Sequence, residues 1–282
     1  MSFAAVAALV VLAMSLIVGG DAAGKLLTQA GFSPFFVAWT RFALAAALLA
    51  PVCGLRRAEL PALLNWRILL RAGLIIGGIC CILSALRTTP IADAFGAFFV
   101  GPIVSYALSA LLLREPVSWL RTALLLVGFA GVLLVVKPGF GVSSGMALAL
   151  LAGCFHGSYL VATRWVAGSY RPRFLLFSQL LVGAVVLAPF GLAPMMPALD
   201  AHLVLLVVIS ALGSAGGNFI LVMVNRAAPA SVIAPLIYSQ LLAATVLGYL
   251  VFGDWPDPLS FLGLSIIILS GLASLYAARG AR

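Results

Sequence analysis

The sequence predicts an all-α integral membrane protein with ten transmembrane helices, arranged as two inverted five-helix repeats around a central cavity. Three observations support this fold class. Of the 282 residues, 64% are apolar and 8% are charged, whereas a soluble domain has roughly 45–50% apolar and about 25% charged residues. Ten apolar segments approach the length of about 20 residues that a helix needs to cross a bilayer. The second half of the chain also repeats features of the first half.

The ten segments follow one another with short connections, which leave no room for a separate soluble domain. The predicted spans are residues 3–22, 33–54, 66–86, 91–113, 118–136, 145–167, 172–191, 202–225, 230–252 and 259–278. The first span resembles a secretory signal in length, but it lacks the basic start that such signals carry. We therefore expect it to remain in the protein as the first helix.

Ten spans place both ends of the chain on one side of the membrane, and the basic residues indicate which side. With the N-terminus in the cytoplasm, twelve arginines fall inside: Arg56, Arg57, Arg67, Arg71, Arg114, Arg121, Arg164, Arg171, Arg173, Arg226, Arg279 and Arg282. Only Lys25, Arg87 and Lys137 fall outside, and Arg41 lies within the second span. This predicts an inner-membrane protein with both termini in the cytoplasm. The net charge of +9 then reflects topology and lipid surroundings, not binding of nucleic acid.

The repeat becomes visible when the chain is shifted against itself by 139 residues. "RTTP" at 87–90 then falls on "RAAP" at 226–229, and Glu115 falls on Asp254. At a shift of 138, Pro34 meets Pro172 and Pro51 meets Pro189. We predict two repeats, residues 1–140 and 141–282, with five spans each. Because five is odd, the second copy is inverted, a plan typical of secondary transporters with a site between the halves.

The two acids that match across the repeat, Glu115 and Asp254, lie in the turns before the fifth and tenth spans. Either they are turn acids that pair with an arginine or face a helix N-terminus, or they belong to a gate. Ser118 and Asp257 match in the same way and are predicted N-caps of those two helices.

The second and third spans each carry polar side chains between apolar ones. Arg41 is expected to bond Asp21 or a backbone carbonyl. The third span places Gly73, Gly77, Cys80, Ser84 and Thr88 on one helical face. Cys80 and Ser84 are candidate contacts for a solute. The GxxxG spacing of the glycines, repeated at Gly213 and Gly217, predicts close packing between helices of one chain more than a dimer contact.

The fourth span carries an aromatic stripe at helical spacing, and the ninth span carries its counterpart. The fourth-span residues are Phe95, Phe98, Phe99, Pro102 and Tyr106, and the ninth span offers Tyr238. Such a stripe is either plain packing or the wall of a cavity. Pro102 and Pro235 interrupt both helices at matching depth, a feature that marks binding sites in transporters.

Five further polar residues are candidates for function. In the sixth span, His156 and Tyr159 lie three residues apart on one face, and Asn218 lies within the eighth. Each is either a bonded packing residue or a contact for a solute, because polar groups within a membrane are costly unless they are paired. Asp21 and Asp93 lie near the outer ends of the first and fourth spans. They are either solvated rim residues or proton sites.

Several stretches resemble a known family. "WTRFALAAALLAP" in the second span, the proline that opens the fourth, "LLLRE" at its end and "GFAGVLLV" in the fifth resemble the ten-helix EamA branch of the drug/metabolite transporter superfamily. Within that branch the chain is most similar to the aromatic amino acid exporters. The resemblance implies a basket of two inverted halves around a central cavity. Asp254, where the family usually has glutamate, and Gln179, opposite Arg41 in the repeat, depart from the pattern.

The expected function is export of small amphipathic metabolites, above all aromatic and large neutral amino acids, by alternating access without a cofactor. A multidrug exporter of organic cations is the alternative, although the predicted cavity is short of acids. An intramembrane hydrolase is the remote alternative: "GVSSG" at 141–145 has the G-x-S-x-G pattern around Ser143, but it lies in a loop between spans and not in a strand-to-helix elbow. A monomer in lipid is expected.

Overall fold

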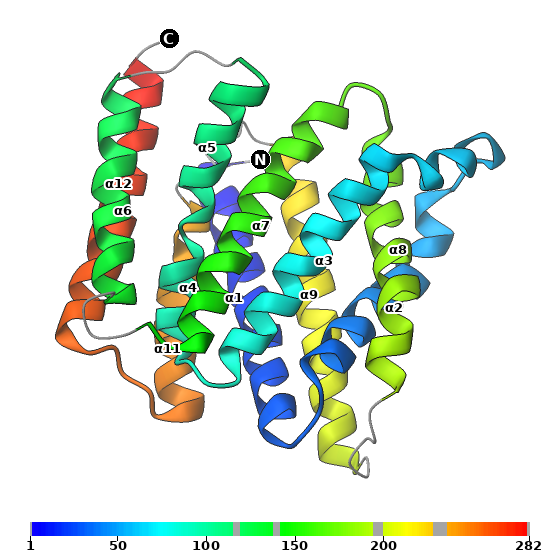
Figure 1. Cartoon of the computed structure of the whole chain (residues 1–282), viewed down its shortest axis with the longest axis horizontal. Coiled ribbons are helices and arrows are strands. Elements are labelled where there is room, and N and C mark those ends of the chain that lie inside the picture. Colours follow the sequence, from blue (N-terminus) through cyan, green and yellow to red (C-terminus); the bar gives the residue numbers. More distant parts are fainter. Residues whose placement is uncertain (1, 115–118, 138–141, 194–199, 228–235, 281–282) are drawn as a thin grey trace.

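The computed structural model describes residues 2–114, 119–137, 142–193, 200–227 and 236–280. Within these residues the regular structure is entirely helical (Figure 1). The elements are α1 (Phe3–Gln29), α2 (Pro34–Cys53), η1 (Arg57–Glu59), η2 (Pro61–Leu64), α3 (Trp66–Leu86), α4 (Ile91–Phe98), α5 (Gly101–Leu112), α6 (Trp119–Val136), α7 (Ser144–Val166), α8 (Pro172–Leu192), α9 (Ala201–Ala227), α11 (Ser239–Phe252) and α12 (Pro258–Gly280).

Seven helical segments are long and apolar enough to cross a membrane, with α4 and α5 joined as Ile91–Leu112. Three further helices are also apolar but shorter: Thr122–Val136, Ser239–Phe252 and Pro258–Ala273. Each of the ten predicted spans overlaps one of these segments, so hydropathy located the helices correctly. The start of α1 and the end of α12 lie toward the same end of the molecule (Figure 1).

The first helix is longer than predicted, because α1 continues past residue 22 to Gln29. The prediction ended there since Asp21 and Lys25 interrupt the apolar run. In the structure both charged side chains are buried, at 5% and 4% exposure. Each has a partner from a distant helix or loop, so tertiary contacts compensate the charge and the helix continues.

The fourth predicted span is divided into α4 and α5, with Phe99 and Val100 between them. Pro102 is the cause, because it has no backbone N–H to donate to the preceding turn and therefore starts a new helix. This confirms the interruption predicted from Pro102. The matching Pro235 lies outside the described residues.

The packing of the helices maps onto itself when the two halves of the chain are exchanged. The pair α1 and α9 has its counterpart in α7 and α3, and the contact of α7 with α4 and α5 has its counterpart in α1 with α11. The pairs α2 with α8 and α6 with α12 map onto themselves, and they form opposite sides of the molecule (Figure 1).

Close approach of helices relies on glycine at a few positions. A Cβ on Gly217 would lie 2.6 Å from the carbonyl oxygen of Ala13, so only glycine lets α9 contact α1 this closely. Gly213 meets the Leu16 carbonyl in the same way, at 2.7 Å. This GxxxG pair therefore packs within one chain, as predicted. In the other pair Gly77 faces Phe155, whereas a Cβ on Gly73 would meet nothing within 4 Å.

The surface suits a lipid surrounding. Many large apolar side chains are exposed, among them Leu126, Val185 and Leu269 at 60%, 65% and 64%. Trp66 and Trp165 form an edge-to-face pair, and the Arg67 guanidinium lies 4.6 Å from the Trp165 ring. Tryptophan and arginine side by side are typical of the membrane–water interface.

Helix caps account for several polar residues. The Ser143 Oγ accepts a hydrogen bond from the Met146 backbone N–H at 3.2 Å and so caps α7. Asp257 Oδ1 accepts from the backbone N–H groups of Leu259 and Ser260 at the start of α12, which confirms the predicted cap. The corresponding cap at Ser118 lies outside the described residues.

Candidate functional site

A cavity of about 730 Å³ lies between the two halves of the chain. Its wall includes residues from α1, α3, α5, α7, α9 and α11. Seven predicted substrate contacts line it: Phe98, Phe99, Pro102, His156, Tyr159, Asn218 and Tyr238. The volume lies within the range of roughly 300–1,000 Å³ that is usual for small-molecule sites.

Aromatic rings make up part of the cavity wall, and we call this part the aromatic wall. The Phe98 and His156 ring centroids are 5.1 Å apart, and those of His156 and Tyr159 are 5.9 Å apart. Phe99 and Tyr238, from opposite halves, have ring centroids 5.1 Å apart with the ring planes tilted by 39°. The break before Pro102 places Phe98 and Phe99 at the junction of α4 and α5. All five of these aromatic residues line the cavity.

Two of the predicted contacts do not line the cavity. Cys80 is buried at 9% exposure in an apolar cluster formed by α1, α2, α3, α8 and α9. The Ser84 hydroxyl donates to the Cys80 carbonyl at 2.7 Å. The face of α3 that does line it carries Ile75, Gly78, Ile79 and Ile82. Cys80 and Ser84 therefore lie on a different face of α3 from the one that lines the cavity.

Arg41 and Asp21 form a buried polar cluster on the cavity wall. Arg41 Nη1 donates to Asp21 Oδ1 at 2.5 Å, and Nη2 donates to the Gly20 carbonyl at 2.7 Å. Its Nε donates to the Ser210 hydroxyl of α9 at 2.9 Å. Both expected partners of Arg41 are confirmed. The solvated rim position is wrong for Asp21, because α9 and α2 cover it.

A second arginine cluster is the counterpart of the first. Arg71 Nη2 donates to the Tyr159 hydroxyl at 3.0 Å, which donates to Gln179 Oε1 at 2.8 Å. Asp21 and Arg41 are 20 residues apart, as are Tyr159 and Gln179. A shift of 138 carries the first pair onto the second, and a shift of 139 carries Arg71 onto Ser210. The guanidinium therefore comes from α2 in one cluster and from α3 in the other.

The sequence reasoning missed Arg71, which it counted among the cytoplasmic arginines. The side chain is 3% exposed, and besides Tyr159 it binds the Thr163 hydroxyl and the Leu175 carbonyl at 2.8 and 2.7 Å. Its position inside an apolar segment, five residues after Trp66, was the available signal. The cavity wall also includes Ser214, Gln240 and Ser270, which were not singled out.

Asn218 lines the cavity and donates from Nδ2 to the Ser214 carbonyl at 2.8 Å, one helical turn away. Because an amide has two N–H groups and an acceptor oxygen, this bond leaves further capacity on the side chain. The described contacts fit either of the roles expected for it.

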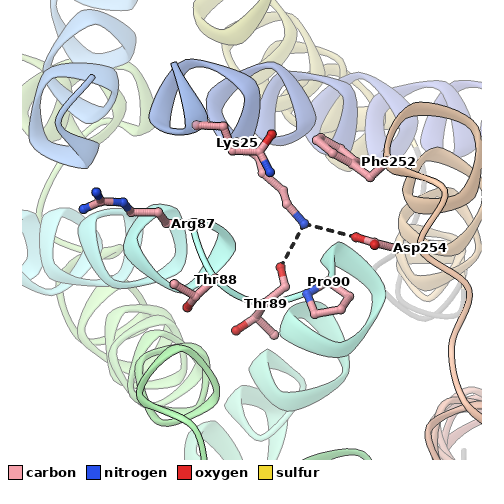
Figure 2. Close-up of a pocket in the computed structure, with 8 residues that line it drawn as sticks. Lys25, Arg87, Thr88, Thr89, Pro90, Phe252 and Asp254 are labelled. Atoms are coloured by element: carbon pink, nitrogen blue, oxygen red, sulfur yellow. Dashed lines mark hydrogen bonds and ion pairs between the residues drawn. The ribbon is translucent and has the colours of Figure 1, made fainter. Parts of the chain in front are cut away.

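A separate charged cluster lies where α1 ends (Figure 2). We call it the Lys25 cluster, and it consists of Lys25, Thr89, Phe252 and Asp254. Lys25 Nζ points between the other three: it donates to the Thr89 carbonyl at 3.1 Å, pairs with Asp254 Oδ2 at 3.3 Å and lies 4.5 Å from the Phe252 ring centroid. A smaller pocket of about 250 Å³ adjoins it.

Within the part of the chain that the structure describes, the other predicted proton or gate acids, Asp93 and Asp254, are not among the residues that line the cavity. Asp93 lies in the first turn of α4, and Glu115 lies outside the described residues. Near Asp93, Lys137 forms an ion pair with Asp257, whose hydrogen bond holds the pKa of that carboxyl at about 2. This pair joins the end of α6 to the start of α12.

The structure defines a multi-pass helical membrane protein with a solute-sized cavity between its halves. A model of the EamA-like transporter family matches residues 4–137 and 143–276, and the chain belongs to this family of the drug/metabolite transporter superfamily. The transporter prediction is thereby confirmed.

Two relatives are named for their solutes. The S-adenosylmethionine uptake transporter of Rickettsia prowazekii (strain Madrid E) is 26% identical over 212 residues, 74% of this chain and 71% of that protein. The riboflavin transporter of Vibrio cholerae serotype O1 (strain ATCC 39315 / El Tor Inaba N16961) is 28% identical over 253 residues, 86% of this chain and 83% of that protein. Neither name indicates an aromatic amino acid exporter.

A crystal structure of a protein resembles this fold over 100% of this chain and 99% of that chain, with a TM-score of 0.66 and 18% identity. At that identity the likeness concerns the fold alone.

Proposed function

We propose that the protein is a secondary transporter that moves small amphipathic solutes with a planar aromatic ring through the central cavity by alternating access. The aromatic wall from Phe98 to Tyr159 is the observation that carries this proposal. Flat rings stack against such walls at favourable offsets. Aromatic amino acids, S-adenosylmethionine and riboflavin all combine a planar ring with a polar part, so the relatives' solutes and the amino acids expected from the sequence share this chemistry.

The proposed architecture is two inverted five-helix halves, residues 1–140 and 141–282. The helix contacts support it, because they stay the same when each helix is exchanged for its counterpart in the other half. In an inverted repeat, each helix contact occurs either twice or between two counterpart helices at the symmetry axis. The matched Asp21–Arg41 and Tyr159–Gln179 pairs support it further.

The proposed conformation has the cavity accessible from the end where α1 begins. Ser109, Leu124 and Arg164 extend its wall toward the end of α5, the start of α6 and the end of α7. The Lys25 cluster and the Lys137–Asp257 pair join the helices at the opposite end. With cytoplasmic termini this is an inward-facing state. Export is the direction we propose, driven by the solute's own gradient or by a coupled ion.

The organic-cation alternative is less well supported. Among the described residues of the cavity wall, Asp21 is the only carboxylate, and Arg41 already pairs with it. The hydrolase alternative has no added support either, since Ser143 caps α7.

The test is transport by the purified protein in liposomes, with labelled L-tryptophan, S-adenosylmethionine, riboflavin and a quaternary ammonium cation, with and without a pH gradient. We expect saturable uptake of at least one of the three ring-bearing solutes and a reduction of roughly tenfold when Phe98→Ala removes a stacking face. Uptake of the cation alone would contradict the proposal.

A further inference from the structure

We infer that the Asp21–Arg41 pair is the polar subsite of the cavity and binds the ammonium and carboxylate of an α-amino acid head group. This inference rests on the proposed function, because it requires the cavity to be the path of the solute. It narrows the solute class to molecules in which a ring carries an α-amino acid.

The pair faces the cavity at the end of an apolar stripe. Met14, Ile17 and Asp21 follow one another at spacings of three and four residues on α1, and all three line the cavity. Arg41 reaches the same wall from α2. A solute whose ring lies against the aromatic wall in this cavity therefore has one fixed pair of opposite charges within the same enclosure.

The bonds within the cluster leave capacity for a ligand. A guanidinium carries five N–H groups, and Arg41 uses one each on Nε, Nη1 and Nη2. One N–H on each of the two Nη atoms remains within the described contacts. Asp21 accepts through Oδ1, which leaves Oδ2 for a donor.

An α-amino carboxylate is complementary to this remaining capacity. Its ammonium donates to Asp21 Oδ2, and its carboxylate accepts from the remaining Nη N–H groups of Arg41. Both bonds join ionised partners, which makes them about twice as strong as neutral hydrogen bonds. A neutral polar group would form weaker hydrogen bonds with Asp21 and with Arg41. A solute with only a cationic group would bind Asp21 alone, and one with only an anionic group would bind Arg41 alone.

The alternative is that the ion pair only joins α1, α2 and α9. A buried pair is weak evidence for stability, because the desolvation of both charges offsets their attraction. Ionisable groups within a membrane more often mark a functional path. The two readings differ in a measurable way: a structural tie affects folding, whereas a subsite affects discrimination between head groups.

The experiment measures inhibition of labelled L-tryptophan uptake into liposomes by unlabelled L-tryptophan, tryptamine and 3-indolepropionate. The last two lack the carboxylate and the ammonium, respectively. For the wild type we expect L-tryptophan to inhibit at a concentration at least tenfold lower than either analogue, as expected for one lost charged hydrogen bond of about 1.5–3 kcal/mol.

The decisive variant is Asp21→Asn together with Arg41→Gln, which removes both charges and leaves neither unpaired. We expect its discrimination between the three compounds to fall to within roughly threefold. The matched control is Glu59→Gln together with Arg171→Gln, an ion pair between a loop and the start of α8, which should keep the wild-type discrimination.

A second variant covers the case in which the double variant does not fold. A Cβ on Gly24 would lie 2.7 Å from Arg41 Nη2, so Gly24→Ala displaces the guanidinium without changing any charge. We expect it to weaken inhibition by 3-indolepropionate and L-tryptophan more than inhibition by tryptamine.

Three outcomes would overturn the inference. The first is that the folded double variant discriminates between the three indole compounds as the wild type does, which would mean that the pair is purely structural. If the double variant does not fold, the same result in Gly24→Ala would have the same meaning. Transport of riboflavin without transport of L-tryptophan or S-adenosylmethionine would leave the proposed function standing and remove the amino acid head group. Transport of none of the three would remove the proposed function and the inference with it.

Discussion

Lys25 of α1 and Asp254, which follows α11, form an ion pair at 3.3 Å although they are 229 residues apart in the chain. One residue belongs to each half of the chain, so the contact joins the halves at the end of the molecule opposite the start of α1. The Thr89 carbonyl and the Phe252 ring complete the surroundings of the ammonium.

This pair is expected to hold one side of the cavity closed. The probe is a cysteine introduced as Phe252→Cys in a protein that lacks the native cysteines. Neutralising the pair with Asp254→Asn should increase the rate at which this cysteine is labelled by roughly two- to fivefold. The effect is modest because a partly exposed ion pair contributes little more than about 1 kcal/mol. Labelling with a membrane-impermeant thiol reagent measures this. The charge reversal Lys25→Asp with Asp254→Lys should restore slow labelling, and fast labelling in the reversed protein would contradict the gate.

Tyr159 links Arg71 to Gln179 through its hydroxyl. Tyr159→Phe should lower the free energy of unfolding by about 1–3 kcal/mol, because it leaves buried polar groups of both partners without that bond. Thermal unfolding in detergent measures the change. Because phenylalanine keeps the ring of Tyr159, the change reports the loss of the hydroxyl alone. A stability equal to that of the wild type would mean that water replaces the hydroxyl.

The two GxxxG motifs should respond differently to the same substitution. Gly217→Ala should destabilise the protein by about 1–3 kcal/mol, since the new methyl group would collide with the Ala13 carbonyl of α1. Gly73→Ala meets nothing within 4 Å and should be neutral or stabilise the helix by up to about 1 kcal/mol. Melting temperatures of the two variants test the contrast, and equal shifts would contradict the packing described for α1 and α9.

The loop between α2 and α3 is tied to α8 by a pH-dependent contact. Arg171 donates to both carboxylate oxygens of Glu59, at 2.7 and 2.6 Å, and this lowers the Glu59 pKa from 4.5 to about 2. A lowered pKa means that the contact stabilises the fold fully above pH 4.5 and that this contribution is lost as the pH falls through about 2. The melting temperature of the wild type should exceed that of Glu59→Gln by a constant margin at neutral pH. The margin should disappear only in strong acid, and a loss already near neutral pH would contradict the assignment.

Much of the helix arrangement could be predicted because membrane helices follow from hydropathy alone. The apolar segments, the break at Pro102 and the cap at Asp257 need only local chemistry, and the structure has all three. The aromatic stripe was also correct, since Phe98, Phe99 and Tyr238 line the cavity. The predicted α3 residues, Cys80 and Ser84, do not line the cavity, because helical periodicity groups residues on one face but does not show which face meets the cavity.

Composition, hydropathy and the internal repeat determined by themselves that this is a helical membrane protein built from two related halves. They did so because lipid demands apolar side chains and internally satisfied backbone, whatever the partners of each helix. The sequence led us to expect Asp21 as a partner of Arg41, whereas tertiary structure alone decided that Lys25 pairs with Asp254 and that Arg71 is buried against Tyr159. Arg71 was counted with the cytoplasmic arginines, although, like Arg41, it lies among apolar residues. Their roles follow from Asp21 in one case and Tyr159 in the other, which folding brings near from distant helices.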